Sequence, residues 1–181
     1  MLLPPTPSQT IGPYYGTALP FPGGGDAAPA GHPAAVTLHG HVRDGEGAPV
    51  SDALLEFWQA APDGSLTGAP GSLRRDGATF TGWARVPTDR DGHYVLRTLR
   101  PGGAPYLALC VHARGLNQHL FTRVYVTEPP PGGDALLAAL PADRRATLLA
   151  RPEAGRRETY RFDVKLQGEG ETVFLDWSAG D

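Results

Sequence analysis

Two histidines that stand one residue apart, His39 and His41, form the first pattern in this chain that could do chemistry. Side chains at positions i and i+2 of a strand point to the same face, so the two imidazoles could share a metal ion. Two ligands do not make a metal site, however, and the sequence identifies no third or fourth. We therefore interpret the pair as exposed histidines on one face of a strand.

The other reactive side chains do not combine into a recognisable catalytic motif. The remaining histidines lie apart, with no serine or cysteine nucleophile and orienting acid beside them: His32, His93, His112 and His119. The single cysteine, Cys110, stands in the middle of an apolar run, which favours a small buried core residue over a nucleophile. The sequence contains neither a nucleophile elbow nor a phosphate-binding glycine loop.

Arg114 is a stronger candidate, because it ends the longest apolar run of the chain, 105–114. Alternation along a strand places Tyr106, Ala108, Cys110, His112 and Arg114 on one face. An arginine at a strand end can reach a loop-lined pocket and pair with a carboxylate substrate. On spacing alone, a surface arginine paired with a structural carboxylate is the favoured interpretation.

Composition limits the classes of function that need to be considered. The 181 residues carry a net charge of −3, which argues against a general binder of nucleic acid. No basic region followed by an apolar stretch opens the chain, and no apolar run is long enough for a membrane span. We therefore expect a soluble, cytoplasmic protein that binds neither nucleic acid nor membrane.

Turn residues divide the chain into many short elements. Prolines and glycines are frequent, with 19 and 24 occurrences, and they separate alternating apolar stretches. We expect strands at 36–43, 53–60, 79–86, 93–98, 105–114, 120–126, 159–167 and 172–177. Leucines at helical spacing predict one or two short helices within 134–150, divided or restarted at Pro141. The fold class is therefore all-β, a β-sandwich of mostly antiparallel strands.

The first 33 residues differ from the rest of the chain. Eight prolines fix the local backbone and disfavour a helix, so residues 1–33 should form an extended N-terminal arm, and residues 34–181 a single β-sandwich domain. The arm carries Ile11, Tyr14, Tyr15 and Phe21, which are poor neighbours for solvent. It could pack on its own domain or wrap around a partner.

Five ordered motifs resemble the intradiol ring-cleaving dioxygenases over nearly the whole chain. They are TPSQTIGPYY (6–15), VRDGEGAPVSDALLEFWQAAPDG (42–64), the segment from Gly82-Trp83 to DGHYVLRTLRPG (82–103), HARGLNQHLFTRVYV (112–126) and YRFDVKLQGEGETVFLDW (160–177). The first two motifs are general in that family. The last two are more typical of its alpha subunits, which are non-catalytic partners in two-chain enzymes.

The resemblance implies an absence as well. Catalytic chains of that family hold Fe³⁺ with two tyrosines and two histidines. Residues 60–92 contain no tyrosine, although the first ligand belongs there. The positions equivalent to the other ligands carry Gly103 or Ala104, then Tyr106 and Ala108. A single phenol cannot replace four ligands, so this chain should bind no metal.

A partner subunit would give a function to a chain that lacks the metal ligands. In the resembled enzymes, similar alpha and beta sandwiches pair, the beta subunit holds the Fe³⁺, and higher-order alpha–beta oligomers form. The resemblance implies that this chain lines the pocket for a small catechol substrate with Thr10, Gly12, Pro13 and Tyr14 from the arm. It also reverses the interpretation of Arg114, which becomes a residue of that pocket.

Two alternatives stay open at this point. The stretch 36–57 also fits a transthyretin-like or carboxypeptidase-regulatory-like β-sandwich, which binds or spaces rather than catalyses. The arm motif and the QGEGETVF motif count against that module. A self-sufficient intradiol enzyme with different iron ligands is the other alternative, and the missing tyrosines count against it.

Overall fold

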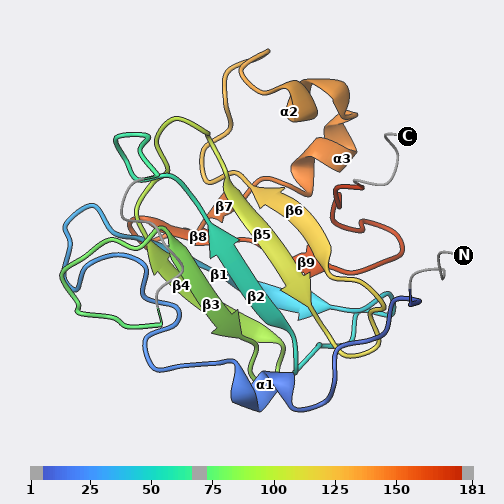
Figure 1. Ribbon diagram of the computed structural model, residues 1–181. Coiled ribbons are helices and arrows are strands. Elements are labelled where there is room, and N and C mark those ends of the chain that lie inside the picture. Colours follow the sequence, from blue (N-terminus) through green and yellow to red (C-terminus); the bar gives the residue numbers. More distant parts are fainter. Residues whose placement is uncertain (1–5, 67–72, 177–181) are drawn as a thin grey trace, which may run out of the picture.

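The computed structural model describes residues 6–66 and 73–176, which form two packed β-sheets with short helices at the periphery (Figure 1). The strands are β1 (Val36–Arg43), β2 (Leu54–Trp58), β3 (Trp83–Pro87), β4 (His93–Thr98), β5 (Leu107–His112), β6 (Leu120–Val124), β7 (Arg151–Pro152), β8 (Thr159–Arg161) and β9 (Val164–Lys165). The helices are α1 (Tyr15–Ala18), α2 (Ala135–Ala139) and α3 (Ala142–Ala146).

Each sheet contains strands that are distant in the sequence. The first sheet has the order β4-β1-β8-β7, with β9 also paired to β1, and the second has the order β3-β2-β5-β6. Most neighbours run antiparallel, whereas β1 pairs in parallel with β8 and β9. The prediction of an all-β sandwich of mostly antiparallel strands is confirmed.

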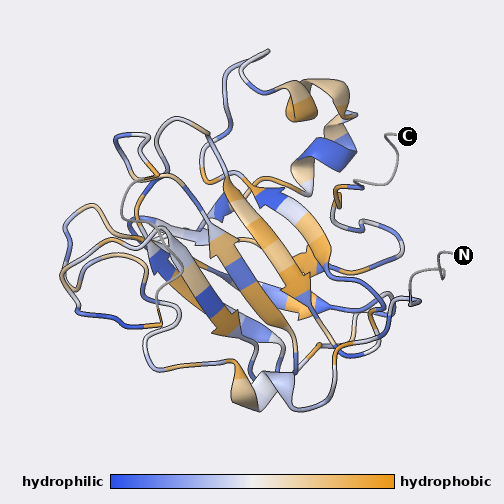
Figure 2. Cartoon of the chain, viewed as in Figure 1, coloured by the Kyte–Doolittle hydropathy of each residue, from blue (hydrophilic) through white to orange (hydrophobic). Residues whose placement is uncertain are grey.

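The core lies between the two sheets, and simple alternation decides which side chains enter it. On β1, Val36, Leu38 and Val42 are buried while the residues between them are partly exposed, apart from the buried Gly40. On β5, Leu107 and Leu109 join the same core. Figure 2 shows hydrophobic residues concentrated on the strands, whereas much of the surrounding loop surface is hydrophilic. The faces predicted for both strands are therefore correct.

The helices follow the sequence signals in one region and depart from them in another. The Asp134 carboxylate caps α2 by accepting from Leu137 N at 3.1 Å, and α3 begins after Pro141, as predicted. The prediction that the arm is helix-free is wrong over one turn, because α1 forms there. The stretch between Pro13 and Pro20 contains no proline, so nothing prevents a short helix that ends before Pro20.

The C-terminal strands are shorter than the sequence patterns suggested. The predicted strand 159–167 is two short strands, β8 and β9, interrupted where the Phe162 carbonyl accepts from the Tyr94 hydroxyl. Residues 172–176 form no strand, because Thr172 bonds to Lys165 of the first sheet and Leu175 to Phe121 of the second. This segment connects the sheet edges instead. Residue 177 lies outside the described residues.

Strand ends account for the other differences. β3 begins at Trp83 rather than at residue 79, directly after Gly82, whose φ of +64° interrupts extended backbone. β2, β5 and β6 lie inside their predicted ranges, and the two-residue β7 was not predicted.

Candidate functional site

The N-terminal arm lies against the loop that follows β5, beside Arg114. Gly115 N–H donates to Thr10 Oγ1 at 3.0 Å, and the Tyr15 hydroxyl donates to the carbonyl oxygen of Asp52. The Asp52 carboxylate lies 3.0 Å from Arg114 Nε. The arm, the turn between β1 and β2, and the end of β5 therefore meet at one place.

The residues that the sequence placed at a substrate pocket form an outward-facing surface there. Thr10, Gly12, Pro13, Tyr14 and Arg114 are all exposed, and we call these five residues the arm surface. Tyr14 is 80% exposed, and the Arg114 side chain is 67% exposed. A guanidinium has five N–H donors, so an ion pair through Nε leaves most of them free to bind another group. The arm surface could therefore contribute to a site completed by another molecule.

Two residues outside the predicted pocket set, Tyr15 and Asp52, anchor this surface. Tyr15 is only 6% exposed, and burial, with the charge of Asp52, raises the pKa of its hydroxyl. The phenol therefore stays protonated and keeps donating to Asp52. A partial signal for Tyr15 was present in the sequence, since it is one of the arm side chains that are poor neighbours for solvent. Nothing in the sequence placed Asp52 beside Arg114.

The positions predicted to be equivalent to iron ligands lie at the opposite end of β5. Ala104 and Tyr106 line a pocket of about 370 Å³ together with Trp58, Gln59, Ala60 and Leu66. Ala108 lies directly opposite Trp58 in the pairing of β2 with β5. The pocket wall is mostly apolar and aromatic.

These residues do not fit a ferric ion. Tyr106 is the only phenol among them, and its ring packs under the Arg123 guanidinium at 4.0 Å from the ring centroid. The two alanines offer no donor atom, and the Gln59 side chain donates to Leu99 O and accepts from Thr98 Oγ1. A stable ferric site needs several anionic or imidazole donors around one point. No step of a reaction is therefore assigned to this pocket.

Cys110 and His112 share the outer face of β5 but do not form a catalytic pair. The sulfur lies 3.4 Å from His112 Nε2. Burial raises the pKa of the Cys110 thiol to about 12, and burial lowers the pKa of His112. Both shifts favour the neutral forms, so the proton stays on sulfur and no thiolate is available. The expectation of a buried, unreactive cysteine agrees with this geometry.

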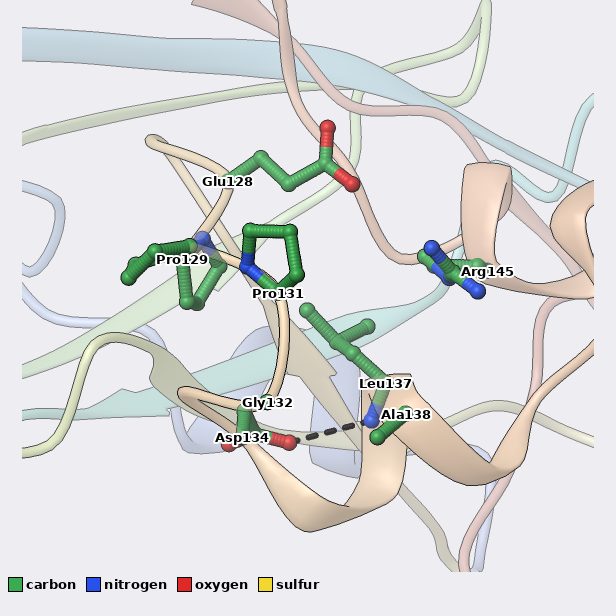
Figure 3. Close-up of a pocket in the computed structure, with 9 residues that line it drawn as sticks. Glu128, Pro129, Pro131, Gly132, Asp134, Leu137, Ala138 and Arg145 are labelled. Atoms are coloured by element: carbon green, nitrogen blue, oxygen red, sulfur yellow. Dashed lines mark hydrogen bonds between the residues drawn. The ribbon is translucent and has the colours of Figure 1, made fainter.

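A cleft of about 320 Å³ between the proline-rich loop after β6 and α2 offers little chemistry (Figure 3). The Asp134 carboxylate at its floor is occupied by the helix cap and by Arg123 at 3.4 Å. Figure 3 places Glu128 and Arg145 on opposite sides of the opening. The cleft therefore has no acid and base positioned together.

Comparison with known proteins identifies the family. A family model described as Dioxygenase matches residues 11–119. The dioxygenase domain of a dioxygenase–carbohydrate-binding fusion from Streptomyces sp. SirexAA-E superposes with a TM-score of 0.61 at 28% identity, over 91% of this chain and 99% of that one. The chain belongs to the dioxygenase family.

Its relatives within that family are more specific. The chain is 42% identical to the protocatechuate 3,4-dioxygenase alpha chain of Burkholderia cepacia, over 94% of this chain and 96% of that one. It is 36% identical to the alpha chain of Pseudomonas putida, over 97% and 98%. The beta chain of Burkholderia cepacia is 27% identical over 76% of this chain and 66% of that one. Similarity is therefore greater to alpha chains than to that beta chain.

None of the helices in the described ranges is long and apolar enough to cross a membrane.

Proposed function

We propose that this chain is the alpha subunit of a protocatechuate 3,4-dioxygenase. That enzyme opens the ring of protocatechuate between its two hydroxyls with O₂, giving 3-carboxy-cis,cis-muconate, a step in the breakdown of aromatic compounds. The chain acts with a beta subunit that holds Fe³⁺. The observation that carries the proposal is end-to-end similarity to alpha chains, combined with Ala104, Tyr106 and Ala108 at the ligand-equivalent positions.

The layout of β5 supports a role on a partner's active site rather than on a site within this chain. Arg114 follows Tyr106 by eight residues, which is up to roughly 26 Å at about 3.3 Å per extended residue. The extended strand Leu107–His112 alone spans roughly 16 Å between them, so Arg114 does not act on a molecule held in the pocket beside Tyr106. Arg114 instead faces outward as part of the arm surface. A residue that completes the pocket of a neighbouring chain would have this orientation.

The arm surface has the chemistry that protocatechuate requires. The substrate carries a carboxylate, which the free N–H donors of Arg114 can bind in a charge-assisted, two-point contact. It also carries an aromatic ring, which can pack against the exposed ring of Tyr14. In the proposed complex, this chain binds and orients the substrate, and the beta chain supplies the metal chemistry.

The partnership with a beta chain has a physical basis in the arm. Proline limits the number of conformations open to the free arm, so fewer are lost when the arm docks. The entropic cost of wrapping around a partner is therefore reduced. The proposal includes a higher-order oligomer of alpha–beta pairs in the cytoplasm.

The deciding experiment compares this chain alone with the same chain co-expressed with its beta subunit. Iron content, colour and oxygen uptake with protocatechuate are measured on both preparations. We expect the lone chain to be colourless, iron-free and inactive, and the complex to be coloured, ferric and active.

Other results would contradict specific parts of the proposal. Iron and ring cleavage in the lone chain would mean that the ligand-equivalent positions are wrongly assigned. Failure of the beta chain to co-purify would remove the alpha-subunit function itself, and would leave a binding module as the better description.

A further inference from the structure

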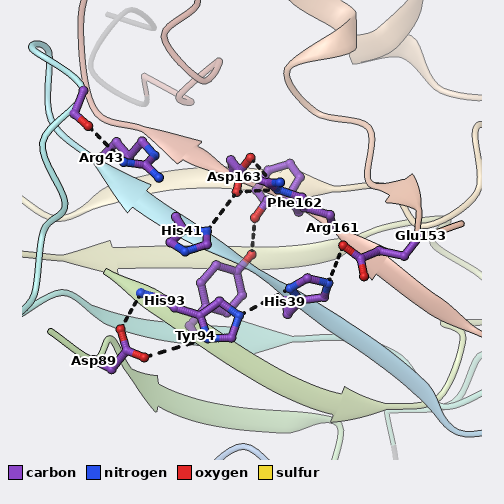
Figure 4. A network of polar contacts seen from close by, with 11 residues as sticks. His39, His41, Arg43, Asp89, His93, Tyr94, Glu153, Arg161, Phe162 and Asp163 are labelled. Atoms are coloured by element: carbon purple, nitrogen blue, oxygen red, sulfur yellow. Dashed lines mark hydrogen bonds and ion pairs between the residues drawn. The ribbon is translucent and has the colours of Figure 1, made fainter. Parts of the chain in front are cut away.

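A cluster of three histidines lies on the outer face of the first sheet, remote in sequence from the arm surface. His39 and His41 are neighbours on one face of β1, and His93 of β4 lies directly opposite His41 in the strand pairing. The His93 ring centroid is 5.5 Å from that of His39 and 5.0 Å from that of His41. Figure 4 shows the three imidazoles gathered between the two strands. Strand pairing thus supplies the third histidine that the sequence did not reveal.

Each imidazole has a carboxylate near one of its ring nitrogens (Figure 4). His39 Nε2 lies 3.2 Å from Glu153 Oε1, and His41 Nδ1 lies 3.7 Å from Asp163 Oδ1. His93 Nδ1 lies 3.9 Å from Asp89 Oδ2. The carboxylates belong to three different segments of the chain.

The two nitrogens that turn away from their carboxylates approach each other. His93 Nε2 lies 3.3 Å from His39 Nδ1. Two imidazole nitrogens bound to one tetrahedral ion, each at about 2.0–2.1 Å, are separated by roughly 3.3 Å. A carboxylate on the other ring nitrogen is the usual outer partner of a metal-binding histidine, because it fixes the tautomer and the ring orientation. The His39–His93 pair therefore has the spacing of two metal ligands, with a carboxylate near the outer nitrogen of each ring.

We propose that His39, His93 and His41 bind one divalent transition-metal ion of the zinc type on this face, with solvent as the fourth ligand. This site is separate from the proposed dioxygenase function. Imidazole is a good ligand for Zn²⁺, Ni²⁺ and Cu²⁺, and a poor one for Mg²⁺ or Ca²⁺. The side chains are 16%, 31% and 26% exposed in that order, so an ion can reach them from solvent.

Binding requires one rearrangement. Within residues 6–66 and 73–176, no three side chains of the ligand types are already arranged to hold a metal ion. His41 must therefore turn its second ring nitrogen toward the existing pair. Among the described residues, His39 Nε2 and His41 Nδ1 are buried without a well-directed hydrogen bond, so these nitrogens do not lock the two rings in their present orientations.

The charges around the cluster allow a divalent ion. Arg161 pairs with Asp163 at 2.9 Å, and Arg156 lies 3.8 Å from Glu153. The charge of Arg43 also acts on His41, and Asp89 lies next to His93, so three carboxylates offset three arginines around the cluster. When the ion binds, the ring protons occupy the nitrogens that face the carboxylates, so the imidazoles stay neutral and bind through the others.

The test titrates the full-length, chelator-treated chain with Zn²⁺ by calorimetry and with Co²⁺ by visible absorption. We expect one ion per chain and the spectrum of tetrahedral Co²⁺. His39→Gln, His41→Gln and His93→Gln should each weaken Zn²⁺ binding by at least about 10-fold. The matched control is His119→Gln, since His119 is exposed in the loop between β5 and β6 of the other sheet, and its affinity should equal that of the natural chain.

Several results would overturn the proposal. The first is a natural chain that binds no stoichiometric Zn²⁺, and the second is equal affinity in the control and the three variants. The third is an unchanged affinity in His41→Gln, because that result would rule out His41 as the third ligand. X-ray absorption of the zinc-loaded natural chain does not depend on any variant folding. Fewer than three imidazoles around zinc would contradict the site.

Discussion

Arg114 combines a structural contact with spare binding capacity. Its Nε–H points to the Asp52 carboxylate at 3.0 Å, while most of the side chain is exposed. An exposed ion pair of this kind contributes at most about 1 kcal/mol to stability. The pair's main effect is to hold the guanidinium beside the arm, where a substrate carboxylate would meet it.

Replacing Arg114 by alanine should therefore change substrate binding more than folding. In the alpha–beta complex, R114A should raise the KM for protocatechuate by about 10- to 100-fold, because a charge-assisted contact worth roughly 1.5–3 kcal/mol is lost. Steady-state oxygen uptake measures this. The comparison is Asp52→Asn, which keeps the guanidinium but weakens the contact that positions it, so its KM should rise by less than that of R114A. An unchanged KM in R114A would contradict the carboxylate contact.

Cys110 should be chemically silent in the folded chain. Burial raises its pKa to about 12, so almost no thiolate exists near neutral pH. We expect a disulfide reagent such as dithiobis-nitrobenzoate to react slowly with the native protein and rapidly after denaturation in guanidinium. Rapid reaction of the native chain would show that the thiol is accessible and ionised.

Strand faces were predictable from the sequence, but contacts between distant strands were not. Alternation alone assigns the buried face of β1 and β5, since one sheet face meets the core. In contrast, His93 opposite His41 depends on strand pairing, which has no local signal. The need for glycine at position 40 also depends on contacts between strands, because a Cβ there would lie 1.8 Å from the Phe162 carbonyl oxygen. Close approaches of this kind are properties of the assembled sheet.

The arm shows the same division between local and distant causes. Proline content predicted an extended arm without a helix, but α1 forms one helical turn there and Ala27 packs into the core of the domain. Which residues of the arm face inward depends on the loop after β5, where Gly115 bonds to Thr10. The resemblance therefore predicted which residues belong to the candidate site. Their arrangement in space could not be predicted from the sequence.

Truncating the arm should separate assembly from folding. Removal of residues 1–13 retains the buried Tyr15 and, within the described residues, breaks the contacts of Thr10 with Gly115 and of Ser8 with Gln118. Each exposed hydrogen bond contributes about 1 kcal/mol or less, so Tm should fall by only a few degrees. The amount of beta chain that co-purifies should fall strongly, and so should the turnover of protocatechuate. If both are unaltered, the arm has no role in the complex.

Several side chains of the sandwich that titrate below neutral pH have lowered pKa values. These shifts all change the free energy of unfolding in the same direction. Burial lowers the pKa of His112, with Glu56 opposing and His119 and Arg85 adding to the effect. Hydrogen bonds lower the pKa of Asp76 to about 2. In both cases the unfolded chain binds protons at a higher pH than the folded chain. Acid should therefore favour unfolding in two successive windows.

The first window contains His112 and also His41, whose pKa burial likewise lowers, and His112 provides the sharper test. A histidine whose folded pKa is depressed contributes stability above its unfolded pKa of about 6.5, and this is lost as pH falls through the folded value. The free energy of unfolding should therefore decline between about pH 7 and pH 5, by less than the limit of about 1.4 kcal/mol per pH unit for one group, since solvent screens a partly exposed imidazole. Urea titrations in the presence of a chelator measure the decline. His112→Gln should be flatter over the same range, because glutamine does not titrate, and equal slopes in the two proteins would assign the acid sensitivity to other groups.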